Sequence, residues 1–188
     1  MFRRIASAIG LVVVLSLIAS CGGLRDVFES TDVDVDIDRQ TVPGFTPLPS
    51  CDAVSELLLE NESIGAFTIN FRQEDELEGM DLSRLDHVTL DRIRLRVVDV
   101  PAGDQDDFDF VDSIRIFADD PGDDRPEVLV AELDPVPENQ TEIVIPGTGV
   151  DIKDIVSDNF IARIEADGRP PCDDVHFRGV AEFQLDFF

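Results

Sequence analysis

The 188-residue sequence contains no tryptophan, no tyrosine, two histidines and a single lysine. Sugar-binding surfaces commonly present flat aromatic rings, so the missing Trp and Tyr disfavour a carbohydrate-binding protein. Zinc sites need several His or Cys ligands, and no serine lies in a nucleophile-elbow motif. No glycine-rich phosphate-binding loop is present. We therefore expect a protein that is not an enzyme and has no evident small-molecule substrate, with paired carboxylates as the only catalytic alternative.

Basic residues are scarce compared with acidic ones. The chain has 15 Lys and Arg against 41 Asp and Glu, which gives a formal net charge of −26. Such a field repels nucleic acid and anionic lipid head groups, so neither is an expected partner. It attracts cations or basic proteins. The alternative is adaptation to saline surroundings, which the scattered distribution of Asp along the chain favours.

The first 21 residues follow the order of a secretory signal. Two arginines near the start precede an uncharged, mostly apolar run over residues 5–19, and small residues then lead to Cys21. The apolar run is shorter than the roughly 20 residues of a membrane-spanning helix. The segment resembles a bacterial lipoprotein signal peptide that ends in a lipobox.

This resemblance implies cleavage before Cys21 and acylation of Cys21, with palmitate among the attached chains. Several acyl chains anchor a protein stably, so the implied location is the cell envelope, with the N-terminal lipid in a membrane. Gly22, in place of the Asp typical of inner-membrane lipoproteins, favours the outer membrane. Removal of residues 1–20 leaves 168 residues with a net charge of −28. We expect residues 21–31 to form a lipidated tether and residues 32–188 one domain.

Alternating apolar and polar residues predict β-strands along most of this domain. Residues 32–38 alternate Asp with Val or Ile, which predicts a strand whose four Asp side chains face solvent. Residues 175–187 alternate over their whole length and predict a long antiparallel strand with one wet side. Between residues 88 and 97 the apolar positions change parity, so we expect a bulge near Asp91 and Arg92.

About eight strands and one short helix are expected in all. The helix begins near Ser50 and places Val54, Leu57 and Leu58 on one face. The predicted fold is all-β, an antiparallel β-sandwich of immunoglobulin- or fibronectin-like architecture, with a small barrel as the alternative. The further strands are expected at residues 67–71, 111–118, 128–133, 142–145 and 160–166.

Two cysteines remain if Cys21 is lipidated. Cys51 and Cys172 form an even pair in a compartment that permits disulfides, and we predict a bond between them. It would close a loop of roughly 120 residues and add about 4–5 kcal/mol by the chain-entropy model. Two free buried thiols are the alternative.

Acidic loops raise the question of calcium, which takes six to eight oxygen ligands. One loop contains Asp104, Asp106, Asp107 and Asp109. A second acidic loop, at residues 119–124, lies beyond the strand predicted at 111–118. The two loops are therefore roughly 20–25 Å apart and cannot share an ion. A Ca²⁺ site at the first loop is one hypothesis, and solvated turn aspartates are the alternative. No other cofactor is expected.

These observations lead to two hypotheses of function. The first is a lipid-anchored envelope protein with a non-catalytic structural or protein-interaction role, whose partner is an unidentified envelope protein. The second is a calcium-dependent binding or adhesion module that uses the loop around Asp106.

The two histidines, His87 and His176, lie at the polar positions of their strands. We therefore expect both to face solvent without a fixed partner.

Overall fold

Eight β-strands make up nearly all of the regular structure. The computed structural model describes residues 29–44, 58–71, 77, 81–100, 107–119, 126–155 and 160–188. The strands are β1 (Glu29–Val42), β2 (Leu59–Ile69), β3 (Leu85–Val97), β4 (Val111–Asp119), β5 (Val128–Leu133), β6 (Glu142–Pro146), β7 (Phe160–Gly168) and β8 (Val175–Phe187). One short 3-10 turn, η4 (Leu82–Arg84), precedes β3.

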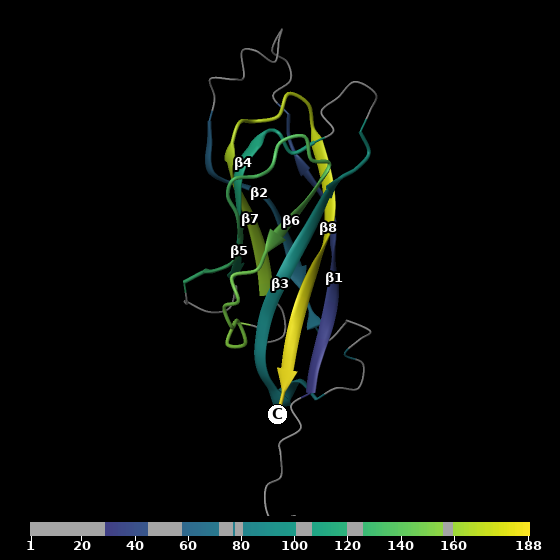
Figure 1. Cartoon of the computed structure of the whole chain (residues 1–188), viewed down its shortest axis with the longest axis vertical. Coiled ribbons are helices and arrows are strands. Elements are labelled where there is room, and N and C mark those ends of the chain that lie inside the picture. Colours follow the sequence, from purple (N-terminus) through teal and green to yellow (C-terminus); the bar gives the residue numbers. More distant parts are fainter. Residues whose placement is uncertain are drawn as a thin grey trace, which may run out of the picture.

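The strands form two four-stranded antiparallel sheets that face each other (Figure 1), in the orders β1-β8-β3-β6 and β2-β7-β4-β5. The expected all-β class and the antiparallel pairing are thereby confirmed. Strands pair as β1–β8, β2–β7, β3–β6 and β4–β5, which nests each pair inside the previous one. This nesting is the topology of a jelly roll. Immunoglobulin sheets have a different strand order, so the expected immunoglobulin- or fibronectin-like type is not confirmed.

The core lies between the two sheets and is wholly apolar in the described part of the chain. In β1 the residues Val33, Val35 and Ile37 are buried and the intervening aspartates are exposed, as the alternating pattern predicted. Phe183 of β8 joins the sheets, because its ring centroid lies 6.0 Å from that of Phe160 in β7. Burial of this apolar surface is the main stabilising contribution to such a sandwich.

The bulge predicted in β3 is confirmed. Leu90 pairs with Phe183 and Arg92 pairs with Glu182, so Asp91 is the extra residue on the bulged strand. The bulge reverses which residues face the core and corrects the change of parity in the sequence. As a consequence, arginines 92, 94 and 96 all lie on the outer face of the β1-β8-β3-β6 sheet.

Strand β1 begins earlier in the chain than the sequence pattern predicts. Strand β1 begins at Glu29 and so includes residues 29–31, which the pattern alone assigned to the tether. The reason is that β8 extends to Phe187, which pairs with Glu29.

The helix expected near Ser50 lies outside the described residues. Within the described ranges, no helix has the length and apolarity required to cross a membrane.

Candidate functional site

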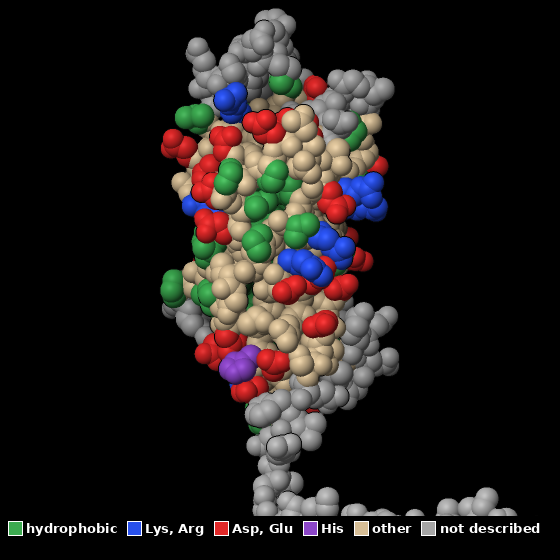
Figure 2. Space-filling view, viewed as in Figure 1, with side chains coloured by type: hydrophobic (Ala, Val, Ile, Leu, Met, Phe, Trp, Pro, Cys, Tyr) green, Lys and Arg blue, Asp and Glu red, His purple; other side chains and the backbone are tan. Residues whose placement is uncertain are grey.

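The outer face of the β1-β8-β3-β6 sheet carries two stripes of opposite charge. Exposed aspartates follow the edge strand β1, at positions 32, 34, 36 and 38. Exposed arginines follow β3, at positions 92, 94 and 96, and we call these the arginine stripe. Strand β8 runs between β1 and β3. Figure 2 shows basic side chains gathered on this face, with acidic and apolar side chains beside them.

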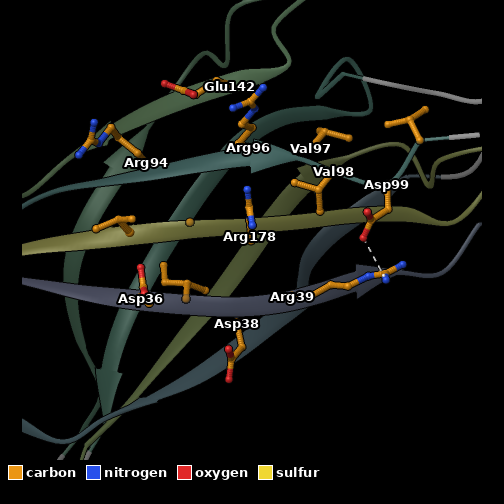
Figure 3. Close-up of a pocket in the computed structure, with 14 residues that line it drawn as sticks. Asp36, Asp38, Arg39, Arg94, Arg96, Val97, Val98, Asp99, Glu142 and Arg178 are labelled. Atoms are coloured by element: carbon orange, nitrogen blue, oxygen red, sulfur yellow. Dashed lines mark ion pairs between the residues drawn. The ribbon is translucent and has the colours of Figure 1, made fainter. Parts of the chain in front are cut away.

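An open hollow of about 940 Å³ lies over one end of this face. Its polar lining includes four arginines and four acidic residues (Figure 3), namely Arg39, Arg94, Arg96, Arg178, Asp36, Asp38, Asp99 and Glu142. Part of the lining is apolar, contributed by Val98, Val100 and Val180. The hollow therefore offers both cationic donors and a small apolar surface.

Three arginines of this face are neutralised by nearby carboxylates. Arg39 lies 3.0 Å from Asp99 between Nη1 and Oδ2. Glu182 of β8 bridges the other two, because Arg92 Nε donates to its Oε2 at 2.7 Å and Arg94 Nη2 lies 2.7 Å from its Oε1. The hydrogen bond from Arg92 lowers the pKa of Glu182 more than its partial burial raises it, so the carboxylate stays ionised.

Arg96 and Arg178 differ from these three. They are directly opposite each other in the β3–β8 register, and both are exposed. On the other side of β3, Arg96 is opposite Glu142 of β6. Neither Arg96 nor Arg178 forms an ion pair or a side-chain hydrogen bond with another described residue. Like charges directly across a strand pair destabilise a sheet, so this pair has an unfavourable interaction that other arginines of the face lack.

A second charged group lies near the far end of the same sheet. His87 Nδ1 is 2.7 Å from Asp151 Oδ2, and His87 Nε2 is 3.5 Å from Asp86 Oδ2. The hydrogen bond to Asp151, followed by the charge of Asp86, raises the pKa of His87 above its usual value. The expectation that the histidines have no fixed partner is wrong. His176 also has one, since its Nδ1 lies 2.9 Å from Thr41 Oγ1.

The two described aspartates of the predicted calcium loop have structural partners. Asp107 Oδ1 accepts a hydrogen bond from the backbone N–H of Asp109 at 3.1 Å, and Asp109 Oδ1 accepts one from the backbone N–H of Asn139. These are turn-stabilising bonds. Asp104 and Asp106 lie outside the described residues. In the ranges that the structure describes, no group of three or more His, Cys, Asp or Glu is placed to hold a metal ion. Calcium binding stays a prediction.

The predicted cysteine sites fall mostly outside the described ranges. Cys172 follows β7 and is disulfide-bonded. Cys21 and Cys51 lie outside the described residues, so the lipidation of Cys21 and the pairing of Cys51 with Cys172 stay predictions.

Sequence reasoning missed the Arg96–Arg178 pair. The alternation of Arg and apolar residues from Arg92 to Arg96 signals an arginine stripe on one strand. The position of Arg178 opposite Arg96 follows only from the pairing of β3 with β8, whose partners are 82 residues apart in the chain.

The fold and this face define a jelly-roll sandwich with a charged, partly apolar hollow on one sheet. No family model matches the chain, and no curated protein is similar to it in sequence. Among solved structures, the chain is similar to a decameric BFDV capsid protein, with 11% sequence identity and a TM-score of 0.43. The alignment covers 86% of this chain and 99% of that chain. We draw no function from a likeness of this degree.

Proposed function

We propose that this chain is a lipid-anchored protein of the cell envelope, in which the sandwich has a non-catalytic structural or protein-interaction role. The observation that carries the proposal is Cys21, which stands directly after the charged, apolar and small-residue segments of a lipoprotein signal. Acylation of Cys21 would tether the sandwich to a membrane, and Gly22 favours the outer membrane. A short tether would keep the charged face within reach of neighbouring envelope proteins.

The distribution of charge supports a surface role. The described interior contains no buried polar or charged residue, whereas catalytic acids and bases are typically desolvated and have strongly perturbed pKa values. The charged residues of the described part gather on the outer faces of the sheets, where a partner has access to them. Strand β1 is an edge strand, and its row of aspartates opposes edge-to-edge pairing with a second copy.

Substitution of Cys21 tests the lipid anchor. We expect the wild-type chain to incorporate radiolabelled palmitate and to fractionate with membranes, and Cys21→Ser to lose both properties, because serine lacks the acylated thiol. Ser20→Ala is the matched control, since it keeps a small residue before Cys21 and should keep the label. A wild-type chain that stays with membranes but takes up no palmitate would contradict the proposal.

A further inference from the structure

Among the arginines of the eight described strands, Arg96 and Arg178 are the two that form no ion pair with a carboxylate of another described residue. On the other sheet, Arg163 donates to Glu127 and Glu165, and Arg115 Nη2 donates to Asp167 at 3.0 Å. The chain has 41 acidic residues against 15 basic ones, so carboxylates are abundant. Even so, Arg96 and Arg178 are partners in the β3–β8 register, and neither forms an ion pair with a described carboxylate.

Two exposed arginines that are opposite each other in a strand pair and line the same hollow are suited to bind an oxyanion. Each guanidinium presents a planar set of donors that matches the two oxygens of a carboxylate, and such charge-assisted bonds are among the stronger ones in proteins. An anion between Arg96 and Arg178 would also replace their mutual repulsion with attraction. The free energy of anion binding therefore includes relief of an unfavourable interaction already present in the sheet.

The surrounding charges select an anion with one negative charge. Glu142 is opposite Arg96 in the register, and Asp38 lines the hollow on the β1 side (Figure 3). These carboxylates oppose a dianion, and the net charge of the chain opposes a polyanion. A carboxylate carries a single charge, whereas a phosphate monoester carries close to two near neutral pH.

The rest of the hollow is suited to a small apolar group. Val98 is half-buried in the lining, Val180 lies beside Arg178 in the outward row of β8, and Val100 is 37% exposed. We propose that Arg96 and Arg178 bind the carboxylate of a ligand whose small apolar group packs against these valines. The inference goes beyond the proposed function and does not depend on the lipid at Cys21.

Such a carboxylate has two possible sources, a free small acid and the C-terminus of a peptide. The test uses the full chain as the cell produces it, in detergent micelles and labelled so that the arginine Nε–Hε signals are visible by NMR. The probes are butyrate, N-acetyl-Ala-Ala with a free carboxylate, the same dipeptide as its amide, and inorganic phosphate, all at constant ionic strength. Saturable shifts of the Arg96 and Arg178 signals are expected for the two carboxylates and not for the amide.

Variants separate specific binding from general charge attraction. Arg96→Gln and Arg178→Gln should each weaken carboxylate binding by about tenfold or more, because each removes a charged donor pair. Arg169→Gln is the matched control, since Arg169 is exposed and lies outside the hollow, and it should bind as the wild type does. Tighter binding of the dipeptide acid than of butyrate would identify a peptide C-terminus, and equal binding a free acid.

Three results would overturn the proposal. The amide could bind as tightly as the acid, phosphate could bind more tightly than either carboxylate, or the wild-type shifts could match those of Arg178→Gln. None of these results bears on palmitate incorporation at Cys21, so failure here is distinguishable from failure of the proposed function.

Discussion

The two sheets share one core, but only the β1-β8-β3-β6 sheet has outward strand arginines that form no ion pair with a described carboxylate. On the β2-β7-β4-β5 sheet, Arg163 is held by Glu127 and Glu165 and lies over the ring of Phe117, with its guanidinium carbon 5.3 Å from the centroid. Arg115 is held by Asp167, which also accepts a hydrogen bond from the backbone N–H of Asn61 at 2.6 Å. On the β1-β8-β3-β6 sheet, Arg96 and Arg178 are opposed to each other.

This difference separates arginines that stabilise the fold from arginines that are available to a ligand. The side chain of Arg163 is only 28% exposed, and its guanidinium donates to two carboxylates, so its role is internal to the sheet. Removal of one member of a partly buried ion pair lowers the free energy of unfolding more than removal of an exposed, unpaired charge. The reason is that the remaining carboxylates are left without a cation. Stability measurements can therefore distinguish the two kinds of arginine.

The largest expected effect concerns the core that both faces share. Phe177 of β8 is fully buried, and its ring centroid lies 6.3 Å from that of Phe108, which precedes β4 of the other sheet. Phe177→Ala should lower the free energy of unfolding by about 3–5 kcal/mol, because it leaves a cavity between the sheets. Urea unfolding followed by circular dichroism measures the loss. Phe177→Leu keeps most of the volume and should lose less, and equal stability of the two variants would show that the sheets do not depend on this contact.

A matched pair of arginine substitutions tests the comparison directly. Arg163→Gln should destabilise the fold by about 1–2 kcal/mol, since two carboxylates lose their cation and Phe117 loses a cation–π contact. Arg178→Gln should change stability by less than about 0.5 kcal/mol, or raise it, because it removes a repulsion with Arg96. The measurement is urea unfolding of both variants in the same buffer. A larger loss for Arg178→Gln than for Arg163→Gln would contradict the division between paired and unpaired arginines.

The features that could be predicted from the sequence are those that depend on residues close together in the chain. The period of two along a strand predicts which side chains face the core, and it placed the bulge near Asp91 and Arg92 from the residues of β3 alone. The nested order of the strands was not predictable in the same way, because alternation says which face is buried and not which strand lies beside it. For that reason the sequence predicted only a sandwich architecture, whose immunoglobulin- or fibronectin-like type the topology does not confirm.

Charged contacts between distant segments were missed for the same reason. Asp151 belongs to the segment after β6, yet it pairs with Thr89 through an isolated bridge and accepts a hydrogen bond from the backbone N–H of Val88 at 3.0 Å. These contacts bring its carboxylate to His87 of β3. The alternating pattern correctly predicted that His87 lies at the surface, where its side chain is 56% exposed. It could not supply a partner from 64 residues away.

The smallest expected effect concerns the other end of the β1-β8-β3-β6 sheet, where several aspartates surround one histidine. There His87 lies among Asp86, Asp151 and Asp186, and the hydrogen bond to Asp151 is the largest of the causes that raise its pKa. A raised folded-state pKa stabilises the fold fully below the unfolded-state value of about 6.5, and this stabilisation is lost as the pH rises through the folded-state pKa. The melting temperature of the wild type should therefore exceed that of His87→Gln by more at about pH 5.5 than at about pH 8.5.

Titration of His87 distinguishes the effect of its hydrogen bond to Asp151 from a general effect of the acidic surroundings. Asp151→Asn keeps the side-chain oxygen that accepts from the backbone N–H groups of Val88 and Lys153, but it removes the charge beside the ring. The NMR-measured pKa of His87 should fall in Asp151→Asn and change less in Asp186→Asn, because Asp186 contributes the weakest of the causes that raise it. If both variants lower the pKa equally, the summed field of the acidic chain controls His87, and the local hydrogen bond has no separate role.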